Sequence, residues 1–522
     1  MTLMLTLGTA AFGAQKTLPS GKDTGSINVT NLKPGDTVTA YQFVKADYNE
    51  YGFTGYSAIN NYVKDPVAPT AQEVIDMASN AATMTVAAEK KVATGDTEVT
   101  LNGLPVGYYL VMVTSGSETV YSPMIAGIYY SKSATDNTLT NGAISADSDF
   151  EIKAQKCWAK SSTPKLEKTI VTPSSKNSKG DDIAIGDKIT FNLSATVPSY
   201  SKEYKKVTYK IYDIMSEGLD YVDGSMKCFI EKYENNRENI KVTPKVNGGI
   251  IEITFDSKFI LEHPGQKIQV EYQAKLNEKA GVNFDANINK AYLEYSNNPA
   301  SGSTAKTGED KVYVYTFGID SNLFGKSTEK WNEKTKELIK VEEGEYQWVE
   351  TEKESGIFTT TTALEGATFT LTNNKTKKSY TATSDKYGYL KFTGLDAGEY
   401  TLQETDAPDG FTLNDAKHTV VITAEYNQDG TLKSYTIKID DKATSTYTAT
   451  YDKGVIKTIT STKDSQGNIS ESAILKNSKM SFLPSTGGVG TTIFAIVGVV
   501  FVAVALGLHM ILRGKSKLEQ DR

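Results

Sequence analysis

The C-terminal end of the chain carries an apolar run from Thr491 to Leu512, and this run constrains where the rest of the protein can fold. As a helix it is long enough to cross the roughly 30 Å apolar core of a bilayer. The basic residues that follow it are Arg513, Lys515 and Lys517. Because positive charge after a span stays in the cytoplasm, we expect a transmembrane segment over residues 490–512 and a cytoplasmic tail over residues 513–522. Everything upstream is then outside the cell.

The N-terminal end is typical of a secreted protein. Met1 to Ala14 is apolar and rich in small residues, like the end of a signal peptide. It has no basic region before the apolar part, so either the start codon lies upstream or the signal is atypical. We expect residues 1–14 to be a signal peptide that is cut near Ala14.

The region between these ends has the pattern of an extracellular all-β protein. A length of 522 residues predicts several domains. Apolar and polar residues alternate with period two in stretches such as Lys188–Val197 and Ser379–Leu390, which Gly, Asp and Asn turns bound. Helical patterning is scarce, and the clearest helix candidate runs from the capping residue Thr70 to Ala82. We therefore predict tandem β-sandwich domains followed by a C-terminal transmembrane helix.

Several classes of site are disfavoured by composition. Two cysteines, Cys157 and Cys228, cannot staple a chain of this size, and both a bridge between them and two unpaired thiols remain open. The scattered histidines are His263, His418 and His509. They form no metal cluster or His-based triad, so no cofactor is expected. The net charge of −7 carries no basic stripe, which makes nucleic acid an unexpected partner.

An internal repeat divides the extracellular part. Leu101–Leu110 and Phe392–Leu402 both contain Gly-Leu-x-x-Gly-x-Tyr, which predicts a glycine turn followed by an alternating strand. Composition shifts at Lys156–Pro164 and at Ser301–Gly308. Two related β-sandwich domains should therefore flank a different one. The expected domains cover residues 15–157, 161–315 and 318–479.

The segment before the apolar run is a short motif, Leu483-Pro484-Ser485-Thr486-Gly487. Pro484 removes a hydrogen-bond donor and biases Leu483 toward an extended conformation, which suits binding in a protease-like cleft. Motif, span and basic tail together resemble the cell-wall sorting signal of Gram-positive surface proteins. The resemblance implies sortase cleavage between Thr486 and Gly487, attachment to peptidoglycan, and a span that is a temporary tether. The alternative is an ordinary anchor after a chance pentapeptide.

The last extracellular domain resembles the Cna-B type, prealbumin-like module. The motifs that carry the resemblance are Leu364–Leu371, Tyr387–Leu395 and Tyr400–Phe411. The third motif matches the strand called the E-box and assigns Glu404 as its glutamate. Alternation places Glu404 on one face with Tyr400 and Leu402, where a buried acid calls for an explanation.

The Cna-B resemblance implies an autocatalytic Lys–Asn isopeptide bond between the first and last strands of the domain. It assigns Glu404 as the acid, Asn477 as the acceptor and Lys326 as the nucleophile, with Lys330 as the alternative lysine. Burial lowers the pKa of a lysine amine and supplies the neutral nucleophile. A neighbouring acid can then polarise the asparagine carbonyl and shuttle the proton that expels ammonia. The alternative is a structural glutamate paired with a lysine near a strand end.

The middle domain resembles the isopeptide-forming fimbrial domain of major pilins. The matching motifs are Thr163–Ile170, Ile211–Leu219 and Asn289–Pro299. They imply Lys168 as nucleophile, Asp213 as acid and Asn289 as acceptor. Alternation places each of the three on an apolar strand face, and Asn287 shares the parity of Asn289 and is its rival. The alternative is a set of strand-end polar residues.

The first domain should lack this chemistry. Alignment of Tyr109–Val113 with Tyr400–Glu404 puts Val113 at the position of the E-box glutamate. We expect no isopeptide bond of the E-box kind in residues 20–150. This domain should therefore be the least resistant of the three to mechanical force and to proteolysis.

The whole arrangement resembles the three-domain backbone pilins of Gram-positive bacteria. The resemblance implies that a sortase joins Thr486 of one subunit to a lysine of the next. Related pilins carry that lysine in a Tyr-Pro-Lys element, where this chain reads Phe150–Lys160. Lys156 has the best position, and Lys160 and Lys153 are the alternatives.

We therefore expect a structural shaft subunit of a sortase-assembled pilus that supports adhesion and colonisation. Apart from self-catalysed bond formation it should not be an enzyme. The implied partners are pilus-specific and housekeeping sortases, identical pilin subunits and peptidoglycan, with minor pilins and host surface ligands as further candidates. The alternative is a wall-anchored adhesin or minor pilin that is never polymerised.

Overall fold

The computed structural model describes most of the extracellular part of the chain. The described residues are 18–115, 118–131, 143–144, 150–171, 177–233, 236–319, 324–328, 336–340, 346–350, 364–385, 390–440, 443–462 and 473–477. The expected signal peptide, sorting motif, transmembrane segment and cytoplasmic tail lie outside these residues. Among the described residues, no helix has the length and apolar character needed to cross a membrane.

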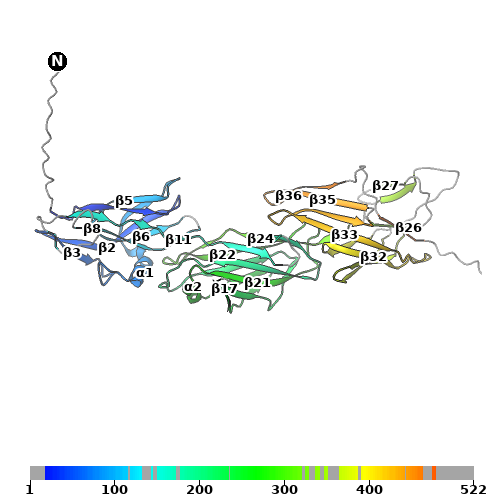
Figure 1. The fold of residues 1–522 in the computed structure, drawn as a ribbon, viewed down its shortest axis with the longest axis horizontal. Coiled ribbons are helices and arrows are strands. Elements are labelled where there is room, and N and C mark those ends of the chain that lie inside the picture. Colours follow the sequence, from blue (N-terminus) through cyan, green and yellow to red (C-terminus); the bar gives the residue numbers. More distant parts are fainter. Residues whose placement is uncertain are drawn as a thin grey trace, which may run out of the picture.

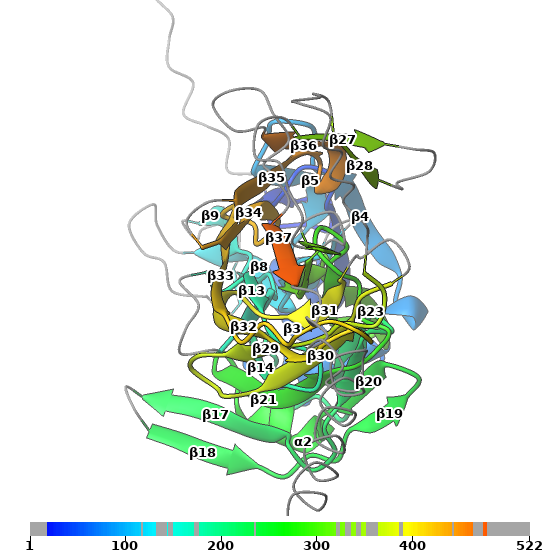
Figure 2. The same cartoon turned by 90° about the vertical axis from the view of Figure 1, so that its right-hand side faces the viewer.

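Three β-rich bodies follow one another along the long axis of the molecule (Figure 1). Seen along that axis, the bodies overlie one another (Figure 2). We call them the first body (β1 to β10), the middle body (β12 to β24) and the third body (β25 to β37). The all-β expectation is confirmed, since strands make up most of the described structure.

The first body is a sandwich of a three-stranded sheet, β10-β1-β5, and a six-stranded sheet, β3-β2-β6-β8-β9, in which β4 also pairs with β2. Its strands are β1 Thr24–Thr30, β2 Thr37–Asn49, β3 Gly52–Ala58, β4 Val86–Lys91, β5 Glu98–Pro105, β6 Gly107–Thr114, β7 Val120–Tyr121, β8 Met124–Ser131, β9 Glu151–Ala154 and β10 Cys157–Trp158.

The predicted helix is present in the first body as α1, Ala71–Ser79. It begins after Thr70, whose side chain accepts a hydrogen bond from the backbone of Glu73, while the Glu73 side chain accepts one from the backbone of Thr70. This reciprocal capping box satisfies N–H groups that the first turn leaves unpaired. The helix ends at Ser79, and a 3-10 turn over Ala81–Thr83 takes the place of its expected last residues.

The middle body packs a six-stranded sheet, β12-β14-β21-β17-β18 with β16 on β21, against a seven-stranded sheet, β13-β24-β22-β15-β20-β19 with β23 on β22. Its elements are β12 Leu166–Ile170, β13 Gly180–Asp182, β14 Lys188–Thr196, β15 Tyr209–Met215, β16 Leu219–Tyr221, β17 Lys227–Tyr233, β18 Asn236–Ile240, β19 Lys245–Asn247, β20 Ile250–Thr254, α2 Ser257–Glu262, β21 Lys267–Leu276, β22 Asn287–Asn298, β23 Ser303–Lys306 and β24 Asp310–Tyr315. The short strand β11, Ser161–Ser162, pairs with β7 and joins this body to the first.

The third body is built on a seven-stranded sheet, β30-β29-β32-β33-β34-β35-β36, with three strand pairs, β25–β31, β26–β37 and β27–β28. Its strands are β25 Phe317–Ile319, β26 Phe324–Thr328, β27 Lys336–Lys340, β28 Tyr346–Glu350, β29 Thr368–Asn373, β30 Ser379–Thr383, β31 Phe392–Leu395, β32 Gly398–Asp406, β33 Lys417–Tyr426, β34 Leu432–Ile439, β35 Ala443–Asp452, β36 Val455–Thr462 and β37 Ala473–Asn477.

The middle and third bodies contact each other through both apolar packing and hydrogen bonds. Phe284, Tyr313 and Tyr315 of the middle body are buried in the same apolar cluster as the core of the third body. Asp182 accepts hydrogen bonds from the hydroxyl of Tyr426 at 2.6 Å and from the backbone N–H of Ala397 at 2.5 Å. The two bodies are therefore fixed to each other by apolar packing and by partly buried hydrogen bonds.

The two cysteines are free and buried in different bodies. Cys157 packs in the core of the first body and Cys228 in that of the middle body. Of the two alternatives that the sequence leaves open, the structure has the unpaired thiols. Burial raises the pKa of Cys157 to about 11 and that of Cys228 to about 12, which keeps both thiols protonated and unreactive.

Candidate functional site

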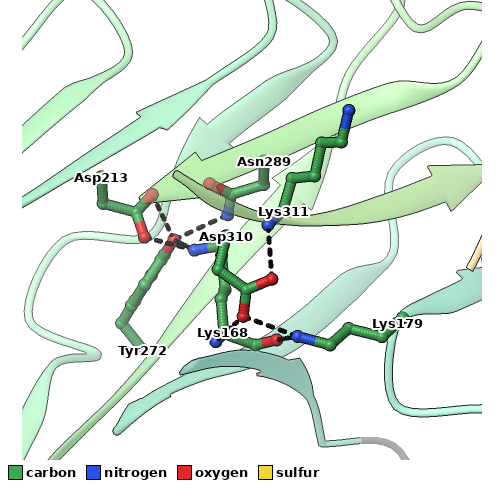
Figure 3. A network of polar contacts seen from close by, with 7 residues as sticks. All are labelled: Lys168, Lys179, Asp213, Tyr272, Asn289, Asp310 and Lys311. Carbon is green, nitrogen blue, oxygen red and sulfur yellow. Dashed lines mark hydrogen bonds and ion pairs between the residues drawn. The ribbon is translucent and has the colours of Figure 1, made fainter. Parts of the chain in front are cut away.

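The middle body holds a polar cluster between its two sheets. Lys168 on β12 and Tyr272 on β21 come from one sheet, and Asp213 on β15 and Asn289 on β22 come from the other (Figure 3). Lys168, Asp213 and Asn289 have no exposure to solvent, and Tyr272 has 1%. Such groups are stable in an apolar core only when they satisfy one another.

Strand alternation is the reason that these side chains point inward. Along β12, Leu166, Lys168 and Ile170 are all buried. Along β15, Asp213 shares the buried face with Ile211 and Met215. Along β22, every second residue from Asn287 to Tyr295 is buried, and Asn289 is one of them. The structure thus brings the three predicted residues into one core.

Tyr272 connects the members of the cluster. Its hydroxyl donates to Asp213 Oδ1 at 2.7 Å. It accepts from Lys168 Nζ at 3.1 Å and from Asn289 Nδ2 at 2.7 Å. Lys168 Nζ also contacts Asp213 Oδ2 directly.

The electrostatic environment favours an uncharged lysine. Burial lowers the pKa of Lys168, and the neighbouring Asp213 carboxylate opposes this shift without cancelling it. The rings of Phe191 and Tyr272 lie beside the amine, with centroids 5.0 and 5.3 Å from Nζ. A neutral amine is the nucleophilic form, so the site holds Lys168 close to the state that acyl chemistry needs.

Asp310 on β24 fixes the backbone of the strand that carries Lys168. Its Oδ2 accepts from the backbone N–H of Lys168 at 2.7 Å and from Lys179 Nζ at 2.6 Å. Lys179 Nζ also donates to the backbone carbonyl of Lys168 at 2.7 Å. The edge strand β12 is therefore held to β24 of the opposite sheet through both backbone polar groups of Lys168, the N–H directly and the carbonyl through Lys179.

Asn287, the rival acceptor, lies in a different environment. Its Oδ1 accepts from the backbone N–H of Gly281 at 3.0 Å, and its Nδ2 donates to the carbonyls of Gly281 and Val314 at 3.1 and 3.2 Å. Asn287 therefore closes a loop. Among the described residues, Asn289 Oδ1 is buried without a hydrogen-bond partner, which leaves its carbonyl open to a proton donor.

Sequence reasoning missed Tyr272, Asp310 and Lys179. The alternation of β21, in which Val270, Tyr272 and Ala274 are buried, predicts that Tyr272 faces the core. Alternation does not predict which side chains of the opposite sheet Tyr272 contacts, because those contacts depend on how the two sheets pack.

In the third body, the strands that carry the predicted lysine and asparagine are neighbours. β26 and β37 run parallel, with Lys326 opposite Leu475 and Thr328 opposite Asn477. Lys326 and Asn477 are therefore two register positions apart on adjacent strands. The alternative, Lys330, lies outside the described residues.

Glu404 is buried on β32, with 2% of its surface exposed. It is opposite Phe369 of β29, and Tyr400 and Leu402 share its buried face, as alternation predicts. Its Oε2 accepts a hydrogen bond from the backbone N–H of Asn414 at 2.7 Å. In the first body, Val113 is buried on β6 opposite Val38.

The three candidate linkage lysines lie at the end of the first body. Lys156 and Lys160 are exposed, and Lys153 on β9 is partly buried. Lys156 and Lys160 flank Trp158, which is 66% exposed, while Cys157 and Ala159 between them are buried. An extended segment thus presents Lys156 and Lys160 on one outward face. The sorting motif Leu483–Gly487 is outside the described residues.

Models of three protein families match separate parts of the chain. A T6 antigen Ig-like domain matches residues 22–161, a prealbumin-like fold domain matches residues 347–436, and an LPXTG cell wall anchor motif matches residues 476–517. The second and third agree with the resemblances of the last extracellular domain and of the C-terminal end.

Full-length similarity extends to known surface proteins. The trypsin-resistant surface T6 protein of Streptococcus pyogenes serotype M6 is 26% identical over 95% of this chain and 96% of its own length. The solved structure of the T6 backbone pilin of serotype M6 Streptococcus pyogenes, described as modular and three-domain, has a TM-score of 0.58 at 21% identity and covers 89% of this chain and all of the pilin chain. The major pilin SpaD of Corynebacterium diphtheriae gives a TM-score of 0.47 at 16% identity, over 89% of this chain and 99% of its own.

Proposed function

We propose that this chain, an LPXTG-anchored protein of the Gram-positive major-pilin type, is the shaft subunit of a covalently polymerised pilus and cross-links its own middle and third bodies. It is located on the cell wall, where the anchor motif attaches it. The observation that carries the proposal is the sealed cluster of Lys168, Asp213 and Asn289 between the two sheets of the middle body.

The reaction in the middle body joins Lys168 to Asn289. The neutral Nζ attacks Asn289 Cγ, the Nζ–Cγ bond forms, and the Cγ–Nδ2 bond breaks. One proton leaves Nζ and reaches Nδ2, so that ammonia departs and an amide remains. Asp213 Oδ2 contacts Lys168 Nζ directly and can therefore take that proton as a general base. The reaction needs no reagent from outside the chain.

The second cross-link would join Lys326 to Asn477 in the third body, with Glu404 as the acid. Support comes from the adjacency of β26 and β37 and from the burial of Glu404 among apolar residues. Each bond would close a loop of more than a hundred residues. On the loop-entropy model a link of that length stabilises by roughly 4 to 5 kcal/mol.

Polymerisation would join Thr486 of one subunit to Lys156 of the next. The sortase cysteine holds Thr486 as a thioester, and the lysine amine attacks it. Lys156 is exposed and lies on a short connection between β9 and β10, which lets an acyl-enzyme approach. Lys160 and Lys153 are the alternative nucleophiles.

The test is co-expression of the full chain with a pilus-specific sortase, followed by boiling in detergent and immunoblotting. A ladder of covalent multimers is expected, and a Thr486→Ala variant should abolish it. A single band in the presence of an active sortase would instead assign the chain as a wall-anchored adhesin or minor pilin.

The linkage lysine is tested separately with lysine-to-arginine variants, which keep the charge but remove the nucleophile. Lys156→Arg should collapse the ladder, with Lys160→Arg and Lys153→Arg as matched controls that keep it. A ladder that survives substitution of all three lysines would overturn the assignment to this segment while leaving the shaft function intact.

A further inference from the structure

The hydroxyl of Tyr272 uses its full hydrogen-bonding capacity inside the cluster. A phenol has one hydrogen to donate and two lone pairs to accept with. Tyr272 donates to Asp213 Oδ1 and accepts from Lys168 Nζ and Asn289 Nδ2. A purely structural tyrosine needs only one partner, whereas this hydroxyl contacts the proposed nucleophile, the carboxylate that takes its proton and the leaving nitrogen together (Figure 3).

The same hydroxyl sets the orientation of the asparagine amide. Because Asn289 Nδ2 donates to the phenol oxygen, Nδ2 points toward Tyr272 and Oδ1 points away from it. The nitrogen that must leave is then held on the side of the proton-carrying groups. Nothing on β22 itself fixes this choice, because the two ends of an amide have nearly the same shape.

Tyr272 also bridges a gap in the path of the proton. The hydrogen bonds of the described residues connect Lys168 directly to Asp213, but they connect Asp213 to Asn289 only through Tyr272. The proton that leaves Nζ must arrive at Nδ2 for ammonia to depart. A relay through the phenol therefore completes the route.

Resting on the cross-link proposed above, we infer that Tyr272 is a catalytic residue, a proton relay between Asp213 and the leaving nitrogen of Asn289. Asp213 takes a proton from Nζ as the Nζ–Cγ bond forms. The protonated carboxyl then gives a proton to the Tyr272 oxygen while the Tyr272 O–H proton passes to Nδ2. The Cγ–Nδ2 bond breaks, ammonia leaves, and Asp213 and Tyr272 return to their starting protonation states.

The environment keeps the phenol in the form that a relay needs. Burial, reinforced by the nearby Asp213 carboxylate, raises the pKa of Tyr272 well above its ordinary value. The hydroxyl therefore remains protonated and hands on a proton only as it receives another.

The test compares Tyr272→Phe with Tyr209→Phe in the full chain. Tyr209 is also buried in the middle-body core, on β15, but its hydroxyl has no hydrogen-bond partner among the described residues. Both variants lose one buried hydroxyl and keep the ring. Cell-free synthesis in mild detergent gives a starting time, and mass spectrometry of proteolytic fragments follows the fraction in which positions 168 and 289 are joined.

We expect Tyr272→Phe to join these positions at least about 100-fold more slowly than the wild type, as for loss of a general acid–base group. Tyr209→Phe should react at the wild-type rate. If Tyr272→Phe reacts as fast as Tyr209→Phe, the relay is overturned and the cross-link stands. If the wild type never forms the joined fragment, the cross-link itself is overturned.

A second variant decides the question if Tyr272→Phe does not fold. Site-specific 3-fluorotyrosine at position 272 keeps the shape of the side chain but makes its hydroxyl more acidic. The relay predicts a changed rate of bond formation for this protein and no change for 3-fluorotyrosine at position 209. An unchanged rate at position 272 would contradict the relay.

Discussion

Lys168 Nζ contacts Asp213 Oδ2 at a place where neither side chain has any exposure to solvent. Burial of two charges removes several kcal/mol of hydration from each, and their attraction returns this only when the geometry is favourable. A neutral Lys168 amine avoids this cost, and its conversion to an amide with Asn289 permanently removes the group that could take up a buried charge. The cluster therefore has a thermodynamic reason to react as well as the geometry to do so.

Substitution of Asn289, the proposed acceptor, should show whether the cross-link forms at this residue and how much it stabilises the protein. Asn289→Ala cannot form the middle-body bond, so the fragments that carry positions 168 and 289 should remain separate in mass spectrometry. The variant also loses the loop closure that the bond provides, and its stability should fall by roughly 4 to 5 kcal/mol. Calorimetric unfolding of the full chain measures this change.

Asn287→Ala is the matched control for Asn289→Ala, because both side chains are buried on the same face of β22. It should still form the cross-link. It should lose about 1 to 3 kcal/mol because backbone groups of Gly281 and Val314 lose their partner. If Asn287→Ala blocks the joined fragment and Asn289→Ala does not, the acceptor has been assigned wrongly.

The junction between the middle and third bodies should weaken as pH rises through 6. Burial raises the pKa of Asp182 to about 6, and the nearby Asp181 and Asp396 reinforce the shift. Between roughly pH 4, where an unfolded aspartate titrates, and pH 6, the docked state binds more protons than the undocked one. Stability of the junction is therefore fully present below this window and declines across it.

Hydrogen exchange at the backbone N–H of Ala397, which donates to Asp182, measures this decline after correction for intrinsic exchange. Protection should decrease from pH 4 to pH 7. Asp182→Asn, which cannot ionise, should remove the pH dependence. Protection that increases with pH in the wild type would show that the sign is wrong.

When the protein is stretched, the middle-body cross-link should leave one segment, residues 290–315, that can still extend. Lys168 lies on β12, the first strand of the middle body, but Asn289 lies on β22, and β23 and β24 follow it. Asn289 is opposite Val312 on β24, the last strand of the middle body. The chain therefore leaves this body close to the proposed bond. Pulling should unzip residues 290–315 before the bond itself carries the force.

Single-molecule stretching tests this expectation. The middle body should lengthen by at most roughly 90 Å, the contour of residues 290–315 at about 3.4 Å per residue. Asp310→Ala should lower the force of this event, because Asp310 fastens β24 to Lys179 and to the backbone of Lys168. A lengthening that corresponds to the whole middle body would mean that no bond is present.

The first body should be the first to be cut by trypsin. It has Val113 at the position that corresponds to Glu404, so an E-box cross-link is not expected there. Limited digestion of the full chain should release fragments from residues 20–150 while the other two bodies remain intact. Loss of an ammonia mass within residues 20–150 would show that the alignment with the third body is wrong.

Much of the fold was predictable because it depends on local patterns. Period-two alternation placed Lys168, Asp213 and Asn289 on buried strand faces, and the capping residue Thr70 marked the start of α1. These are properties of one strand or one helix end. They require no knowledge of how elements pack.

What could not be predicted depends on packing between sheets. Asn287 and Asn289 have the same parity, and their different partners are decided by the loop at Gly281 and by Tyr272 on the other sheet. The clamp of Asp310 on β12 likewise joins residues far apart in the sequence. The junction at Asp182 depends on contacts between bodies, for which alternation carries no signal.

The most direct test of internal cross-linking is the intact mass of the full chain. Two isopeptide bonds expel two ammonia molecules, so the measured mass should be about 34 Da below the mass of the same polypeptide without them. Lys168→Ala should reduce the deficit to about 17 Da, since only the third-body bond can then form. A full chain with no mass deficit would contradict the account.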